Sequence, residues 1–440
     1  MKQNKIIKGA LIISIGSFLT KLIGAFYRIP LTKILGAQGI GLYQMAFPLY
    51  CLLLTFSSQG VPNGIAKLIA GGLNAQKVLK SALKLFAPIG LLASLLMAIF
   101  SSKIATLQGN IMAKGCYLFL SPSIFLVSVI SCFRGYFQGL SNMLPTAISQ
   151  ILEQVIKCIF GLVLCYIFRK NLILATNMAI LSVTLSEMVA TAYFIILYNK
   201  KSTFSLLKSA QTSVKKVGVV VLPIMLATIT IPLCRTVESF MVVNILKSYL
   251  QNATSLYGIY SGGVESVVSV PVALCYGLCV SSIPEIAKRI CVNKKVKLTV
   301  FLTIASGLFF AILLYFFSPI VVRVLYSSLL ENEKIIMVKM LKIASFSVFF
   351  LSLMQTSSAV LIALSKTKIT LFSGIFSAIL KLILSYFLLK IPNINIFACI
   401  FTDIFSYFVA CFLNLVYIVI VLKKLKGKSY EQNNFSRVRD

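Results

Sequence analysis

The chain has 440 residues, of which 59% are hydrophobic, and 42 Lys and Arg against 10 acids give a formal net charge of +32. This apolar share exceeds that of an ordinary soluble domain and leaves no room for a soluble catalytic domain. We interpret the excess of cations as the topology signal of a membrane protein, so we expect no nucleic-acid partner.

Long apolar stretches predict about twelve transmembrane helices, because roughly 20 such residues cross the hydrocarbon core. In chain order they cover residues 8–31, 39–60, 81–101, 114–134, 144–168, 172–198, 216–246, 254–283, 298–319, 338–364, 369–390 and 397–422. An even number of spans places both termini on one side, and the flanking lysines mark that side as cytoplasmic. We therefore expect a multi-pass protein of the plasma membrane with both termini in the cytoplasm.

The first stretch carries two cations, Lys21 and Arg28. A cation near the bilayer centre costs about 2.5–3.5 kcal/mol on insertion scales, so it usually faces a protein interior or a water-filled cavity. The spacing of two helical turns puts both side chains on one face. Arg28 lies next to Pro30, where we expect a kink, and its planar fork of donors suits phosphate oxygens. The pair predicts contact with an anionic head group; snorkelling or an internal ion pair is the alternative.

Other charges lie within the later stretches. As further substrate-binding candidates we take Arg235, Lys157 and Lys381, and as coupling or gating candidates Glu153, Glu238, Glu265, Glu187 and Asp403. The acid-first i,i+4 spacing of Glu153 and Lys157 favours a mutually neutralising pair. The i,i+3 spacing of Arg235 and Glu238 allows the same, whereas any partners of Glu187 and Asp403 must come from other helices.

Glu265 follows Gly262-Gly263 and precedes Pro271. Two glycines and a proline around one intramembrane acid predict a helix that bends or unwinds there, as transporter helices often do at their sites. Close helix packing at the glycines is the alternative. We expect H⁺ or Na⁺ as the coupling ion handled at this position, and no other cofactor.

The two halves of the chain repeat. Ser121 matches Ser345 and Lys157 matches Lys381 at one constant offset. A buried lysine at matching positions of two spans is unlikely to arise from composition alone. Because each half has an even number of spans, the repeats lie parallel, related by an axis along the membrane normal.

The repeat sets the expected architecture. We predict an all-α polytopic membrane protein with about twelve transmembrane helices in two parallel six-helix bundles around a central cavity. The bundles occupy residues 1–200 and 216–426, a cytoplasmic linker covers 201–215, and a polar cytoplasmic tail covers 427–440.

Two motifs are familiar. Residues 133–139 read FRGYFQG and are followed by PTAISQ at 145–150, and the first stretch adds Lys21, Gly24 and Arg28. With these motifs the chain resembles the stage V sporulation protein B group of the multidrug/oligosaccharidyl-lipid/polysaccharide (MOP) exporter superfamily.

The resemblance implies a flippase-like transporter with two bundles around a V-shaped cavity. Related lipid II flippases carry an undecaprenyl-pyrophosphate-linked peptidoglycan precursor outward, and the sporulation branch is associated with spore cortex. In those flippases basic residues of the first helix face the cavity, and Lys21 and Arg28 match them. This sequence departs from them in having room for only twelve helices, without the two C-terminal helices thought to hold the lipid tail.

We therefore expect a flippase for a polyprenyl-pyrophosphate-linked glycan, with cell-wall synthases as partners. A MATE-type cation-coupled multidrug exporter is the alternative, but it would favour acids on the first helices, and the first acid here is Glu153. A non-transporting scaffold that recruits a cell-wall synthase is a third hypothesis. We expect no enzyme and no metal site, because the sequence has no His, no CxxC pair and no P-loop.

Overall fold

The computed structural model describes residues 2–55, 60–201, 214–215, 217–221, 230–280, 286, 292–364 and 366–437, which form helices and their connections. Nine of the described helices are long and apolar enough to cross a membrane. They coincide with the predicted stretches other than 8–31, 39–60 and 216–246. Those three run partly outside the residues whose side chains are described, and they stay predictions.

The chain forms two compact units. Unit 1 comprises Met1–Gly263 and Val324–Lys334, and unit 2 comprises Val264–Arg323 and Ile335–Asp440. The predicted bundles at 1–200 and 216–426 remain predictions.

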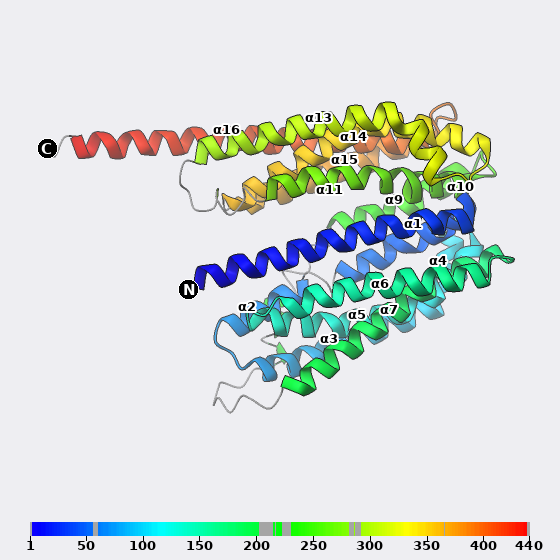
Figure 1. Cartoon of the computed structure of the whole chain (residues 1–440), viewed down its shortest axis with the longest axis horizontal. Coiled ribbons are helices and arrows are strands. Elements are labelled where there is room, and N and C mark those ends of the chain that lie inside the picture. The colour runs from blue at the N-terminus through cyan, green and yellow to red at the C-terminus, as the bar shows by residue number, and fades with distance from the viewer. Residues whose placement is uncertain are drawn as a thin grey trace. The chain divides into compact units, whose positions relative to one another are not determined.

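Unit 1 is built mainly from long helices in antiparallel succession. Its elements are α1 (Lys2–Thr55), α2 (Val61–Ala70), α3 (Ala75–Ile99), α4 (Ser101–Leu107), the 3₁₀ turn η2 (Ile111–Ala113), α5 (Lys114–Gly139), α6 (Leu144–Ile167), α7 (Leu172–Lys201), α9 (Thr230–Lys247), α10 (Ala253–Tyr257) and the π-helical η3 (Gly258–Val264), whose last residue belongs to unit 2. α3 packs on α5, α5 on α7, α7 on α6 and α6 on α1, as Figure 1 shows.

α1 changes direction at Gly36. There the backbone has φ 60° and ψ −173°, a left-handed conformation that glycine adopts without a steric penalty. The break lies between the predicted stretches 8–31 and 39–60, as their bounds require, and the kink expected at Pro30 stays a prediction. The second part of α1 packs on α9 and α10. This contact needs glycine, because a Cβ on Gly41 would overlap the backbone of Thr254.

The FRGYFQG motif has a packing role on α5. Added Cβ atoms on Gly135 and Gly139 would press into Ile65 and Ile69 of α2, so the two glycines let α2 and α5 approach closely. Phe133 stacks on Phe194 of α7 with ring centroids 6.0 Å apart. The motif thus packs α5 against α2 and α7. Its arginine, Arg134, takes no part in these contacts.

Unit 2 contains α11 (Glu265–Val280), α13 (Val292–Leu325), α14 (Glu331–Ala363), α15 (Thr367–Leu389) and α16 (Phe397–Arg437), with the end of α13 and the start of α14 counted in unit 1. Small polar side chains join these helices. Asn414 of α16 donates to Ser357 of α14 over 3.2 Å and accepts from Ser373 of α15 over 2.7 Å. Such contacts suit a bilayer, where apolar surface alone provides little drive for helix association.

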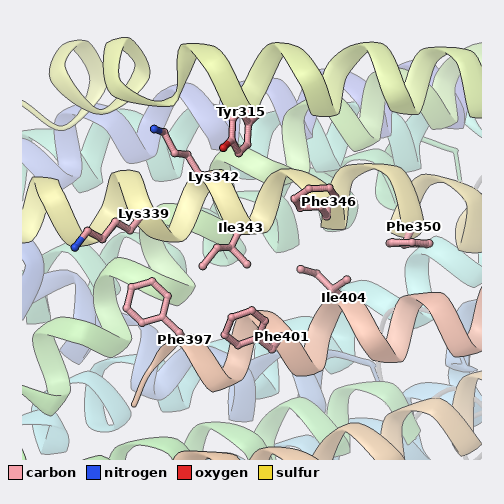
Figure 2. A pocket seen from close by; sticks show the side chains of 9 residues that line it. All are labelled: Tyr315, Lys339, Lys342, Ile343, Phe346, Phe350, Phe397, Phe401 and Ile404. Atoms are coloured by element: carbon pink, nitrogen blue, oxygen red, sulfur yellow. The ribbon is translucent and has the colours of Figure 1, made fainter. Parts of the chain in front are cut away.

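Many long apolar side chains point outward, as a lipid-facing surface requires. Leu92 of α3 is 59% exposed, and Phe316 of α13 is 69% exposed. Unit 2 also has a pocket between α13, α14 and α16, lined mostly by aromatic side chains (Figure 2).

Candidate functional site

Arg28 is held on α1 opposite the π-helical segment. Its side chain is half-buried, and Nη1 donates to the carbonyl oxygens of Ser261 and Gly262 at 3.5 Å each. A π-helical turn shifts the regular i→i−4 pattern, so carbonyls there are open to other donors. Lys21 lies on the same helix, but its side chain is outside the described residues, and its contact with substrate stays a prediction.

The prediction of an irregular helix before Glu265 is confirmed. Residues Gly258–Val264 are π-helical, and Glu265 is the first residue of α11. The alternative, close packing, also holds, because a Cβ on Gly262 would overlap the side chain of Ile40. Glu265 is half-buried. Its handling of an ion remains a prediction.

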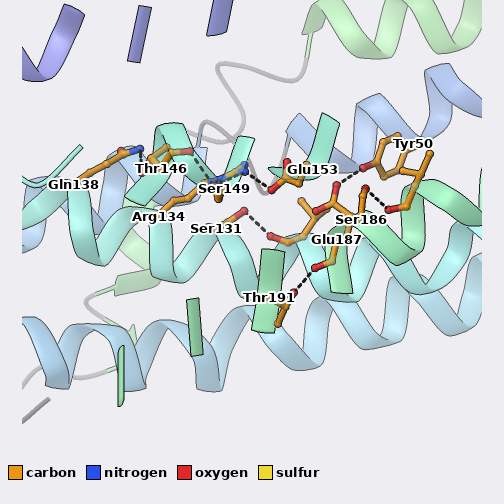
Figure 3. Close-up of polar contacts among 12 residues, drawn as sticks. Tyr50, Ser131, Arg134, Gln138, Thr146, Ser149, Glu153, Ser186, Glu187 and Thr191 are labelled. Atoms are coloured by element: carbon orange, nitrogen blue, oxygen red, sulfur yellow. Dashed lines mark hydrogen bonds and ion pairs between the residues drawn. The ribbon is translucent and has the colours of Figure 1, made fainter. Parts of the chain in front are cut away.

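Arg134 and Glu153 form a buried ion pair between α5 and α6 (Figure 3). Arg134 Nη2 lies 2.5 Å from Glu153 Oε1, and it also donates to Ser149 Oγ over 3.1 Å. The two side chains are only 8% and 13% exposed. The expected pairing of Glu153 with Lys157 is therefore wrong.

Sequence reasoning missed Arg134 because the predicted stretch 114–134 ended on it. The helix continues to Gly139, so Arg134 lies inside it. The signal was present in the FRGYFQG motif: Gly135 and Gly139 turn one face of α5 toward α2, which leaves Arg134 directed at another helix.

Glu187 of α7 has its partner on α1. The Tyr50 hydroxyl donates to Glu187 Oε1 over 2.9 Å, and both residues are buried (Figure 3). Glu187 also lies within electrostatic range of Glu153, Arg134 and Lys157. Helices α1, α5, α6 and α7 thus bring their charged groups together inside unit 1.

Lys157 of α6 belongs to the same cluster but has a different kind of contact. Its Nζ lies 5.9 Å from the centroid of the Tyr27 ring, a cation–π arrangement. The residue is half-buried, and in the part of the chain that the structure describes no carboxylate lies within 4.0 Å of its ammonium group.

Three of the predicted cations converge on the second part of α1. Arg28, Lys157 and Arg235 all lie within electrostatic range of the Cys51 thiol. Arg235 is exposed on α9, whereas Glu238, one turn further on, is buried. Unit 1 therefore gathers most of the predicted site residues around α1.

Lys381 and Asp403 meet in unit 2. Lys381 Nζ of α15 lies 2.7 Å from Asp403 Oδ1 of α16, and the side chains are 11% and 7% exposed. The sequence assigned them separate roles, in substrate binding and in coupling, and both roles stay predictions. Elsewhere in the described residues, no group of three or more His, Cys, Asp or Glu side chains could hold a metal ion.

Long apolar helices with buried charged groups define a multi-pass membrane protein, and solved structures show its fold. An inward-facing MATE family transporter of the MOP superfamily superposes with a TM-score of 0.76 at 12% identity, covering 93% of this chain and 96% of that chain. The lipid II flippase MurJ in an inward closed conformation gives a TM-score of 0.76 at 16% identity, covering 93% and 87%. The predicted fold class, an all-α polytopic membrane protein of the MOP type, is confirmed.

Comparison of the sequence with known proteins identifies the family. The profile of the polysaccharide biosynthesis protein family matches residues 6–290, and the chain belongs to this family. Stage V sporulation protein B of Bacillus subtilis (strain 168) is 24% identical over 420 residues, covering 90% of this chain and 80% of the relative. The lipid II flippase MurJ of the same organism is 22% identical over 470 residues, covering 98% and 84%. The resemblance inferred from the motifs is confirmed.

Proposed function

We propose that the protein is a flippase that moves a lipid-linked oligosaccharide or peptidoglycan precursor across the bacterial plasma membrane, in cell-wall or spore-cortex synthesis. The observation that carries this proposal is the convergence of Arg28, Lys157 and Arg235 around Cys51 inside one helical unit. A pyrophosphate-linked glycan supplies the negative charge that such a group of cations attracts. Relatives that include a lipid II flippase support the same substrate class.

Lys157 is the cation best placed to meet a substrate anion. The two acids within its electrostatic range, Glu153 and Glu187, already have close partners in Arg134 and Tyr50. The half-buried ammonium of Lys157 lies over an aromatic ring and has no close carboxylate among the described residues. A phosphate oxygen would therefore lower its free energy more than it would that of a lysine already in an ion pair. Arg28 adds a planar fork of donors to the same substrate.

Transport by alternating access needs no covalent chemistry from the protein, and we propose a transporter rather than an enzyme. H⁺ or Na⁺, handled at Glu265, would couple the cycle, and cell-wall synthases would receive the precursor. Lysine-rich flanks support an orientation with both termini in the cytoplasm.

A MATE-type multidrug exporter is the second candidate, because such a transporter matches the fold as well as MurJ does. An exporter of cationic drugs needs acids where the drug binds, since opposite charges offset the loss of hydration. Here α1 carries no acid at all, and the first acid of the chain is Glu153, already paired with Arg134.

The test is outward translocation of fluorescent lipid II in proteoliposomes. We expect wild-type protein to translocate it, and Arg28→Ala and Lys157→Gln to reduce the rate by about tenfold or more, as loss of a charge-assisted contact predicts. Lys103→Gln, on the exposed face of α4, is the matched control and should leave the rate unchanged. Unfolding temperatures verify that each variant is folded.

Two results would contradict the proposal. Ion-driven export of ethidium without lipid II translocation would support the exporter, and translocation that survives both cation substitutions would remove the assigned role of the cluster.

A further inference from the structure

Unit 2 contains a pocket that lies apart from the charged cluster of unit 1. It has a volume of about 580 Å³ and lies between α13, α14 and α16. Its wall is aromatic along most of its length, with Tyr315 from α13, Phe346 and Phe350 from α14, and Phe401 from α16. Phe346 is 56% exposed, so the wall opens outward rather than into the core. None of these residues belongs to the charged cluster of unit 1.

One end of this groove is positively charged. Lys339 and Lys342 lie one turn apart on α14, and Figure 2 shows them at one end of the row with Phe350 at the other. Lys342 Nζ lies 5.7 Å from the Tyr315 ring centroid. Among the described residues no carboxylate pairs with either lysine.

The groove has the polarity profile of one bilayer leaflet. α14 has no charged residue from 343 to 363, about the length that crosses the hydrocarbon core. Lys339 and Lys342 come directly before this run, at the level of lipid head groups. Phe346 and Phe350 follow one and two turns deeper, at the level of acyl chains.

We propose that this groove binds an anionic phospholipid of the surrounding bilayer. Its phosphate lies at Lys339 and Lys342, and one acyl chain lies along Phe346 and Phe350. Charge complementarity selects the occupant: two lysines without a carboxylate partner attract a negative head group, whereas a zwitterionic lipid brings its own cation. The groove shares no residue with the charged cluster of unit 1, so lipid binding there does not depend on the proposed transport function.

The absence of tryptophan from the chain makes a clean experiment available. Phe346→Trp places a single fluorophore in the groove at an exposed position, where folding tolerates it. Phe316→Trp places one on the outer face of α13, next to the pocket-lining Tyr315, as the matched control. Each protein is reconstituted in vesicles that contain either brominated phosphatidylglycerol or brominated phosphatidylcholine, which quench a tryptophan they touch.

We expect phosphatidylglycerol to quench the fluorescence of the Phe346→Trp variant more strongly at equal mole fraction, with a binding preference of about fivefold per lysine. Adding Lys339→Gln and Lys342→Gln should remove the preference without changing quenching by phosphatidylcholine. The Phe316→Trp control should show no preference.

Equal quenching by the two lipids at Phe346→Trp would overturn the proposal, as would a preference that survives loss of both lysines. Displacement of phosphatidylglycerol by a trace of polyprenyl phosphate would also overturn it, because the groove would then be a site for the isoprenoid lipid. Native mass spectrometry gives an independent readout: wild-type protein should retain phosphatidylglycerol that the double lysine variant loses.

Discussion

Matching lysines of the two halves have come to lie in different surroundings. Lys381 in unit 2 is buried against Asp403, with 2.7 Å between ammonium and carboxylate. Lys157, its counterpart in unit 1, lies over the Tyr27 ring instead. The predicted repeat thus places a cation at both positions, and among the described residues only Lys381 has a carboxylate within ion-pair distance.

The acids of unit 1 explain the difference. Glu153, one turn before Lys157 on α6, is drawn to Arg134 of α5, and Glu187 accepts a hydrogen bond from Tyr50. Unit 2 therefore neutralises its lysine internally, whereas the proposed function gives Lys157 of unit 1 the substrate anion as its partner.

Breaking the unit 2 pair should have the largest effect. Asp403→Asn or Lys381→Gln leaves one charge buried without its partner, and we expect each to lower the free energy of unfolding by about 3–5 kcal/mol. The double variant Lys381→Met/Asp403→Leu should recover most of this loss, because it buries no charge. Denaturation in detergent measures all three, and a double variant as unstable as the singles would show that the pair is not what matters there.

Substitution of Arg134 tests whether its ion pair with Glu153 keeps that acid away from Lys157. Arg134→Gln should lower the free energy of unfolding by about 3 kcal/mol, because Glu153 then stays buried without a cation. Arg134→Lys keeps the charge but loses the two hydrogen bonds that Nε and Nη2 of Arg134 donate to Ser149 Oγ, and it should lower the free energy of unfolding by about half as much. If Lys157 instead moved to Glu153 and rescued the first variant, the loss would be small and transport would fall.

Removal of the Tyr50 hydroxyl should have a smaller effect. Tyr50→Phe deletes the hydrogen bond to buried Glu187, and we expect a loss of about 1–2 kcal/mol in unfolding free energy. Tyr43→Phe, a buried tyrosine on the same helix whose hydroxyl has no hydrogen bond among the described residues, is the control and should change little. Equal losses in the two variants would argue against the bond.

The smallest stability effect belongs to Lys157. Lys157→Gln removes only a cation–π contact, so the free energy of unfolding should fall by about 1 kcal/mol or less. Its effect on translocation should be far larger than its effect on folding, the reverse of the result for Lys381→Gln. Unfolding and transport are measured in parallel on Lys157→Gln and Lys381→Gln. If Lys157→Gln lowers the free energy of unfolding as much as Lys381→Gln does, the two lysines do not differ in the way described.

Much of the fold could be predicted because hydropathy alone locates a membrane helix. The bilayer imposes its thickness on every span, and nine predicted stretches coincide with described helices. The irregular segment before Glu265 was also predictable, since its glycines mark it locally. The break at Gly36 falls in the gap between the predicted stretches 8–31 and 39–60, so its place was predictable, although the left-handed conformation of the glycine was not.

The site was harder to predict, because ion pairs between helices depend on which helices are neighbours. The i,i+4 rule favoured Glu153 with Lys157, but tertiary packing brought Arg134 closer. Asp403 and Glu187 have no partner within reach on their own helices, so nothing in the linear sequence named Lys381 or Tyr50.

The π-helical segment Gly258–Val264 also bears on how the chain tolerates insertions and deletions. Its wider turn accommodates more residues than an α-helical turn does. Deleting one residue there would restore α-helical winding and leave Glu265, with everything after it on α11, facing nearly the same direction, because the π-helical turns absorb the extra residue. A single-codon deletion in this segment would thus keep the intramembrane acid in place, whereas the same deletion in a regular α-helix would turn it by about 100°.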